Sequence, residues 1–248
     1  MSAFSDFWDR ITGRDTLLAI MKSQSDELKA NATELQNDAA LIEQFKKAVL
    51  DMKGQIPVID PLETYWNTKR PATNGYTYPA RTILDGSVNI SMDPRLFWER
   101  WDSSIPSFSG EANDAKAMTC LRWVINNIAY TPDVTQFKHI EEWLHAHETF
   151  FLRKGDCEDG AILMGNIMLK SGIPYWRIRL NAGDVKGGGH CWVTYLRESD
   201  NVWYILDWCY YPNDSLRWLP WKAAENYFNI WFSFNRDFIF AQDALDKP

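Results

Sequence analysis

The sequence predicts an α+β protein in which helices pack on an antiparallel sheet, preceded by a long-helix or coiled-coil N-terminal arm. Three observations support this class. Residues 15–53 contain no proline and carry apolar side chains at steps of three and four. Helical spacing returns over residues 114–128. After residue 174, short runs of branched and aromatic residues alternate with polar turns, which is typical of antiparallel strands.

The arm has the spacing of a coiled coil or helical hairpin. From Met21, steps of four and three lead to Ser25, Leu28, Ala32, Leu35, Ala39, Ile42, Lys46 and Val49. Most of these are apolar, and polar residues fill the positions between them, so we expect self-association or partner subunits through residues 15–53. An amphipathic helix that lies on its own core is the alternative.

The 248 residues suit one core domain with an appendage, or two small domains. We expect a helical arm over 1–53, an ordered connector rich in proline and aromatic residues over 54–110, and a core over 111–248. Within these parts, short helices are expected over 95–101 and 221–228, longer helices over 114–128 and 157–169, and strands over 175–180, 191–196 and 202–208. Most of the 13 tryptophans are assigned to core packing. The alternative is that some line a groove for a peptide or glycan, or contact partner subunits.

Charge and composition limit the partners and the compartment. A net charge of −7 argues against nucleic acid, since phosphate binding needs concentrated Lys and Arg. No stretch approaches the ~20 apolar residues of a membrane span, and the N-terminus lacks the basic start and apolar run of a signal peptide. Four cysteines without disulfide-framework spacing indicate reduced thiols. We expect a cytoplasmic protein, or a virion component if a phage encodes it.

Cys157 stands where a helix begins. It follows Gly155 and Asp156 and precedes an apolar periodic run. At a helix N-terminus, unpaired amide groups and the helix dipole favour the thiolate, which is a nucleophile. A small buried apolar side chain is the alternative for a lone cysteine in this position.

A base and an orienting acid follow in the predicted hairpin. If residues 198–201 form its loop, His190 faces Cys209. His190 and Asp207 then lie on one sheet face as diagonal neighbours, within reach of a polar contact. A one-residue slip would place them on opposite faces. The glycines at 187–189 would let this backbone approach the cysteine helix closely.

Several segments share one order along the chain: Ile125 to Asp133, Trp143 with Glu148-Thr149, Gly155-Asp156-Cys157-Glu158-Asp159, Gly172-Ile173-Pro174, His190-Cys191-Trp192-Val193 and Ile205-Leu206-Asp207. Over about residues 115–212 this pattern resembles the transglutaminase-like superfamily, in particular its bacterial cysteine-proteinase branch. The resemblance implies a papain-like core with Cys157 as nucleophile, His190 as base and Asp207 as orienting acid. Gly160 departs from the pattern, which commonly has an aromatic residue or alanine there.

The implied chemistry is acyl transfer on protein or peptide amides. The Cys157 thiolate attacks the carbonyl, and water (protease or amidase) or an amine (transamidase) releases the acyl group. The backbone amide of Cys157 is one oxyanion donor, and the side chain of Trp143 or His147 is a candidate for the second. The alternative is a structural subunit of a larger assembly, such as a phage virion, with a silent or binding fold of this kind.

Acidic residues beside the thiol suggest a metal. Asp156, Glu158 and Asp159 offer the oxygen ligands that calcium prefers, although such acids more often cap a helix. The triad itself requires no cofactor, so calcium is an optional ligand. A zinc site has suitable ligand types but no paired cysteine spacing in Cys157, His190 and Cys209. His145 and His147 should diverge, because they stand two apart in an expected helix.

Overall fold

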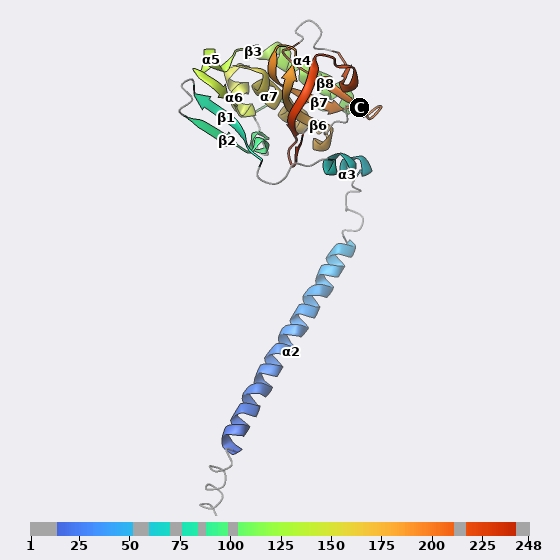
Figure 1. The fold of residues 1–248 in the computed structure, drawn as a ribbon. Helices are drawn as coiled ribbons and strands as arrows, with labels where there is room; N and C mark the ends of the chain where they lie inside the picture. Colours follow the sequence, from blue (N-terminus) through green and yellow to red (C-terminus); the bar gives the residue numbers. More distant parts are fainter. Residues whose placement is uncertain are drawn as a thin grey trace, which may run out of the picture. The chain divides into compact units, whose positions relative to one another are not determined.

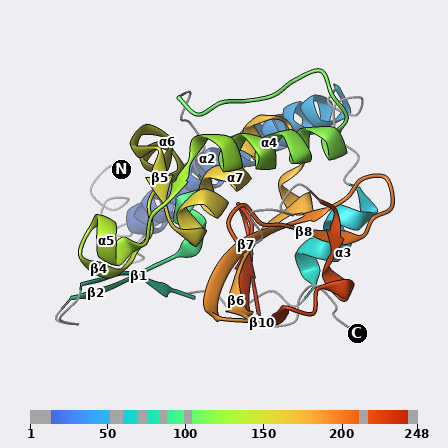
Figure 2. The same ribbon diagram turned by 90° about the horizontal axis from the view of Figure 1, so that it is seen from above.

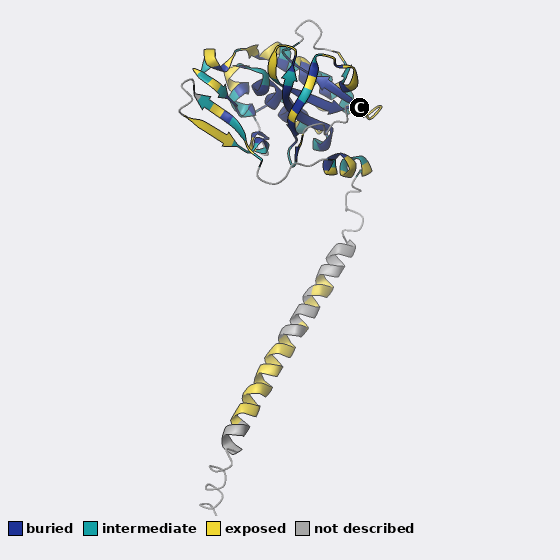
Figure 3. Cartoon of the chain, viewed as in Figure 1, coloured by how far each residue is buried: buried dark blue, intermediate teal, exposed yellow. Residues whose placement is uncertain are grey.

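The computed structural model describes residues 14–51, 60–69, 76–83, 88–98, 104–210 and 217–241, in two compact units, Met1–Val58 and Ile59–Pro248. In the first unit, Arg14–Asp51 form helix α2 (Figure 1), which confirms the long N-terminal helix. The side chains of residues 19–33 are exposed (Figure 3). Within the described residues, no helix is both long and apolar enough to cross a membrane.

The second unit is built on a six-stranded antiparallel sheet with the strand order β11-β10-β6-β7-β8-β9. Its strands are β6 (Ile178–Val185), β7 (Gly188–Leu196), β8 (Trp203–Leu206), β9 (Leu219–Pro220), β10 (Tyr227–Phe234) and β11 (Ile239–Phe240). β7 pairs with β6 along most of its length and with β8 over four residues, so the backbone of these strands is fixed.

Helices cover one face of this sheet (Figure 2): α4 (Asn113–Asn127), α6 (Ala146–Leu152) and α7 (Cys157–Lys170). α7 lies on β6 and β7, and α4 and α6 pack beside it. Residues 158–168 of α7 are buried. Helices packed on an antiparallel sheet confirm the predicted α+β class.

The opposite face of the sheet carries a second apolar cluster. It includes Trp66 from α3 (Pro61–Thr68), together with Trp192, Trp203 and Trp221. The sequence assigned the last three to core packing. Trp231 differs from these, because it is 38% exposed. Most of the late tryptophans therefore fill the core, and at least one remains available to a ligand.

Two smaller sheets complete the unit. β2 (Asn89–Met92), β1 (Tyr78–Ile83) and β4 (His139–Glu142) pair antiparallel, whereas β3 (Ala129–Tyr130) and β5 (Lys154–Gly155) pair parallel. The short helix α5 (Asp133–Gln136) lies between β3 and β4 in sequence. Because β5 ends two residues before Cys157, its pairing with β3 fixes the backbone that leads into α7.

Some predicted elements differ from the structure. The helix expected over 221–228 is wrong: a 3₁₀ turn, Trp221–Ala223, is followed by strand β10. The aromatic and branched residues of β10 suit a strand, and β6 offers an edge for pairing, so tertiary pairing overrides the weak helical pattern. The strand expected over 175–180 begins only at Ile178, and the strand expected over 202–208 already ends at Leu206. A short helix is expected over 95–101. The structure has a 3₁₀ turn at Pro94–Phe97, and residues 99–101 lie outside the described residues.

Candidate active site

The β7–β8 hairpin has the register that the sequence predicts. Val193 pairs with Leu206, which leaves residues 198–201 as the loop. Strand β8 ends at Leu206, so Asp207 follows it directly. His190 Nε2 and Asp207 Oδ2 lie 2.6 Å apart, in hydrogen-bond contact.

Both oxygens of the Asp207 carboxylate accept hydrogen bonds. Oδ2 also accepts a 2.7 Å hydrogen bond from the Tyr227 hydroxyl, and Oδ1 accepts from the backbone amides of Cys209 at 3.0 Å and Tyr210 at 3.1 Å. Burial opposes ionisation of this carboxyl, but the charge and hydrogen bond of His190, with these other donors, outweigh it and hold the pKa of Asp207 below its usual value. Sequence reasoning missed Tyr227, because residue 227 fell in the wrongly predicted helix.

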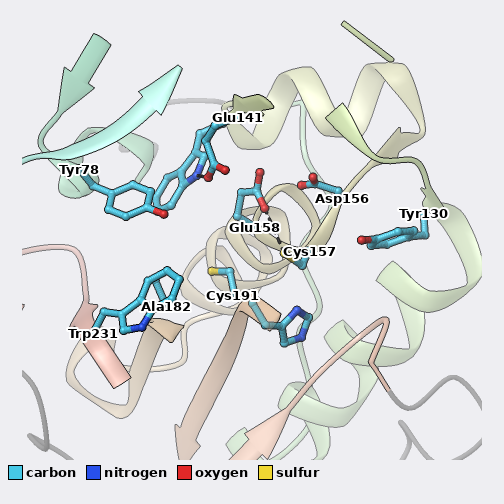
Figure 4. Close-up of a pocket in the computed structure, with 12 residues that line it drawn as sticks. Tyr78, Tyr130, Glu141, Asp156, Cys157, Glu158, Ala182, Cys191 and Trp231 are labelled. Atoms are coloured by element: carbon cyan, nitrogen blue, oxygen red, sulfur yellow. Dashed lines mark hydrogen bonds between the residues drawn. The ribbon is translucent and has the colours of Figure 1, made fainter. Parts of the chain in front are cut away.

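Cys157 is the first residue of α7 and lines a cavity of about 220 Å³ together with His190 (Figure 4). Its half-buried thiol donates a 3.1 Å hydrogen bond to Glu158 Oε2. Gly155 is required just before it, since a Cβ there would lie 2.5 Å from the side chain of Asp159. The proposed nucleophile and base thus line one cavity, and the thiol keeps its proton and points it at the Glu158 carboxyl.

Trp208 links the segment of Asp207 to the backbone of Cys157. It follows Asp207 in sequence, and its indole Nε1 donates a 3.1 Å hydrogen bond to the backbone carbonyl of Cys157. A Cβ on Gly160 would come within 2.2 Å of the same indole. This packing explains the departure from the family pattern at Gly160, where any side chain would push Trp208 away from the start of α7.

The glycine run has another role than the one expected. Gly187 and Gly188 adopt φ of 127° and 143°, which side chains rarely tolerate, and they form the tight connection between β6 and β7. A Cβ on Gly189 would lie 2.9 Å from the Trp231 ring, so the close approach is to β10. Of these three residues, none meets the cysteine helix within 4 Å of its Cβ position.

The expectation that the helix N-terminus favours the Cys157 thiolate is wrong for this arrangement. Burial, and then the nearby charge of Asp156, raise the pKa of the Cys157 thiol well above its usual value. The dipole of one helix is outweighed because α7 begins among carboxylates. A thiolate at Cys157 therefore needs a base to take its proton.

Asp156 and Asp159 form a carboxylate cluster with Asp133, a residue that sequence reasoning did not include. Ligand atoms of the three lie within 4.8 Å of one another. Oδ1 of Asp133 and Oδ1 of Asp156 are buried and have no hydrogen-bond partner within the described part of the chain. Burial, and then the charge of Asp156, raise the pKa of Asp133 to about 8. Glu158 instead groups with Asp156 and the thiol. Asp159 also caps α7, since its Oδ2 accepts from the backbone amide of Asp156 and its Oδ1 from that of Leu144. The unpartnered oxygens of Asp133 and Asp156 are therefore the ones that best fit a hard cation, which would compensate the buried charges.

The zinc ligands considered from the sequence come together only in part. His190 and Cys209 lie within 4.8 Å of each other and of Asp207, and Cys157 is outside that group among the described residues. Both carboxylate oxygens of Asp207 already accept hydrogen bonds. The arrangement therefore favours a hydrogen-bonded acid over a zinc ligand.

Trp143 and His147, the candidate oxyanion donors, lie in different surroundings. Trp143 lines the cavity, but its Nε1 donates a 2.6 Å hydrogen bond to Glu141 Oε1. His147 is outside the set of cavity-lining residues, and its ring stacks on His145 at 5.8 Å. The two histidines do not diverge as expected, because His145 is the N-cap of α6 with extended backbone (φ −66°, ψ 154°).

Comparison with known proteins gives one family match. Residues 107–208, which contain Cys157, His190 and Asp207, match the model of the transglutaminase-like superfamily. Among solved structures, the chain is similar to LapG of Legionella pneumophila, with a TM-score of 0.46 and 18% identity over 54% of this chain and 71% of that chain. EGTA-treated and calcium-bound LapG of L. pneumophila match with TM-scores of 0.44 and 17% identity, over 54% of this chain and 69% and 71% of theirs. No curated protein sequence matches the chain.

Proposed function

We propose that the transglutaminase-like core at residues 107–208 catalyses cysteine-dependent acyl transfer on protein or peptide amides. Cys157 is the nucleophile, His190 the base and Asp207 the orienting acid. The observation that carries the proposal is the 2.6 Å contact between His190 and Asp207 at the cavity that also holds the Cys157 thiol.

In the proposed mechanism, each group has one step. Asp207 holds the Nε2 side of His190, so Nδ1 is the ring nitrogen left to take the thiol proton. The sulfur then attacks the amide carbonyl carbon, and the backbone amide of Cys157 donates to the developing oxyanion. As the C–N bond breaks, the imidazolium returns its proton to the leaving amine. Water or an amine then attacks the thioester, which releases a carboxylic acid or a new amide and restores the thiol.

A peptide library analysed by mass spectrometry tests the reaction class. Products should be free carboxylic acids with water as acceptor and new amides when a primary amine is added. Prior treatment with iodoacetamide should abolish both. Turnover that survives complete alkylation of Cys157 would overturn the proposal.

We also propose that Asp133, Asp156 and Asp159 hold calcium. Without the ion, the raised pKa of Asp133 means that the folded state favours the protonated carboxyl, so its contribution to stability is lost as pH rises from about 4 through about 8. Calcium must displace that proton. Calcium at about 100 times its Kd is therefore expected to raise the melting temperature by about 5–10 °C at pH 8 and by less at pH 6.

The matched variants are Asp133→Asn, which should lose the calcium response, and Asp26→Asn on the exposed face of α2, which should keep it. Equal melting temperatures in calcium and in EGTA at pH 8 would contradict a calcium site.

The arm is proposed to mediate self-association. Met21, Leu28 and Ile42, which share one heptad position, are 59%, 69% and 54% exposed. Deletion of residues 1–53 should reduce the mass measured by size-exclusion chromatography with light scattering to that of a monomer, and the full-length double variant Leu28→Glu, Ile42→Glu should do the same. Alkylation of Cys157 should persist in both. Identical masses for the wild type and the double variant would exclude this interface.

A further inference from the structure

The cavity beside Cys157 combines acidic and aromatic walls. Three of its twelve lining residues are acids, and none is Lys or Arg. Four more are aromatic: Tyr78, Tyr130, Trp143 and Trp231. In Figure 4, Tyr78 and Glu141 face Trp231 across the cavity, on the far side of Glu158 and Cys191 from Tyr130. A substrate group that enters beyond the thiol thus meets carboxylates and ring faces together.

Glu141 is fixed in this wall. Its Oε1 accepts a 2.6 Å hydrogen bond from the Trp143 indole, and the Trp143 ring packs 5.2 Å from Tyr78 and 6.1 Å from Phe234. These contacts leave little freedom for the Glu141 carboxylate to withdraw. Burial raises the pKa of Glu141 to about 7, so a cationic partner would stabilise the ionised carboxylate.

The Glu158 carboxyl is a second, independent indication that this cavity binds a hydrogen-bond donor. It is 4% exposed and lines the cavity, and its Oε1 has no hydrogen-bond partner among the residues that the structure describes. A hydrogen-bond donor of a bound ligand would satisfy this buried carboxyl oxygen.

Trp231 presents an aromatic surface at the opposite wall. Its Nε1 donates a 2.9 Å hydrogen bond to Asp184 Oδ2, which also accepts a 3.1 Å bond from Asn229. The ring lies against Gly189, next to His190, and any side chain at position 189 would displace it. An exposed aromatic face opposite a fixed carboxylate is a suitable environment for a cation.

We propose that this cavity selects a positively charged group of the substrate, with Glu141 as the specificity-determining residue. The group is either a Lys or Arg side chain next to the scissile amide or the ammonium of an amine acceptor. A neutral group would leave the Glu141 carboxylate dehydrated and unpaired, whereas a cation pairs with it and stacks on the rings. The inference rests on the proposed function only in taking Cys157 as the reacting residue.

The first test needs no turnover. Cationic aminoethyl and anionic sulfonatoethyl methanethiosulfonate are compared as labels of Cys157 in wild type, Glu141→Gln and the control Glu225→Gln, an exposed carboxylate outside the cavity. Gln keeps the acceptor for Trp143 and removes the charge. The wild type should favour the cationic label by roughly 10–100-fold, a preference that collapses to a few-fold in Glu141→Gln and persists in Glu225→Gln. A ratio unchanged by Glu141→Gln overturns the inference.

Substrates then distinguish the two sources of charge. Paired peptides that differ only in Lys against Met beside the cleaved bond report on a side chain, through kcat/KM. Cadaverine against the neutral acceptor hydroxylamine reports on an amine acceptor. The pair of compounds that shows a charge preference dependent on Glu141 identifies the source. Turnover without such a preference in either comparison would contradict the inference and leave the proposed function intact. Charge-selective labelling of Cys157 without any turnover would contradict only the proposed function.

Discussion

Replacement of Cys157 by alanine is expected to abolish amide turnover and to leave the fold intact. Without the sulfur no thioester can form, and removal of one member of a catalytic triad typically costs about 10⁴-fold or more in kcat. The fold should persist because alanine suits the first turn of a helix and the thiol is only half-buried. The measurement is kcat/KM with the melting temperature of the same preparation.

A second thiol provides the control. Cys120 is fully buried in α4 and lies outside the cavity lining, so Cys120→Ala should lower the melting temperature and keep the activity per folded molecule. Full turnover by Cys157→Ala on a substrate that the wild type cleaves would show that another group is the nucleophile.

Asp207→Asn is expected to lower the rate by roughly 10–10⁴-fold, with the upper limit set by the equivalent change in a serine triad. Asparagine can still accept from the amides of Cys209 and Tyr210, which places its NH₂ group toward His190. Nε2 must then accept a hydrogen bond, so the proton moves to Nδ1 and the ring can no longer take the thiol proton. Cysteine is intrinsically a strong nucleophile, so the lower part of the range is expected.

Tyr227→Phe separates geometry from charge in the same measurement. It removes one of the donors to Asp207 Oδ2 and keeps both the carboxylate and its contact with His190. The rate of Tyr227→Phe should therefore fall less than that of Asp207→Asn. The melting temperature of Asp207→Asn itself should stay near that of the wild type. Equal rates for wild type and Asp207→Asn would reduce the triad to a dyad.

Local patterns in the sequence predict the parts of the site that local rules control. The start of α7 follows from Gly155 and the apolar run after Cys157, and the hairpin register follows from a four-residue loop. Because side chains alternate along a strand, that register puts His190 on the same side of the sheet as Asp207, which follows β8 directly.

The remaining parts depend on contacts between distant segments. Asp133 joins Asp156 and Asp159 only because β3 pairs with β5, and Glu141 reaches the cavity only through β4. No periodicity in the sequence reports such pairings.

The same limit explains the error over the thiol. A helix N-terminus is visible in the sequence, but the burial of Cys157 and the number of carboxylates around it are tertiary facts. Tyr227 was likewise missed, because the edge of β6 that turns its segment into a strand is not visible in the sequence.

The pH dependence of Cys157 alkylation by iodoacetamide, in wild type and Asp207→Asn in calcium-containing buffer, tests most directly whether the three residues act as a unit. An isolated thiol here should react only above the usual range of about 8.5, because burial and Asp156 raise the pKa of Cys157. If His190, held by Asp207, takes the proton, the wild type should retain reactivity near neutral pH and Asp207→Asn should lose it. Superimposable profiles would contradict a Cys157–His190–Asp207 triad.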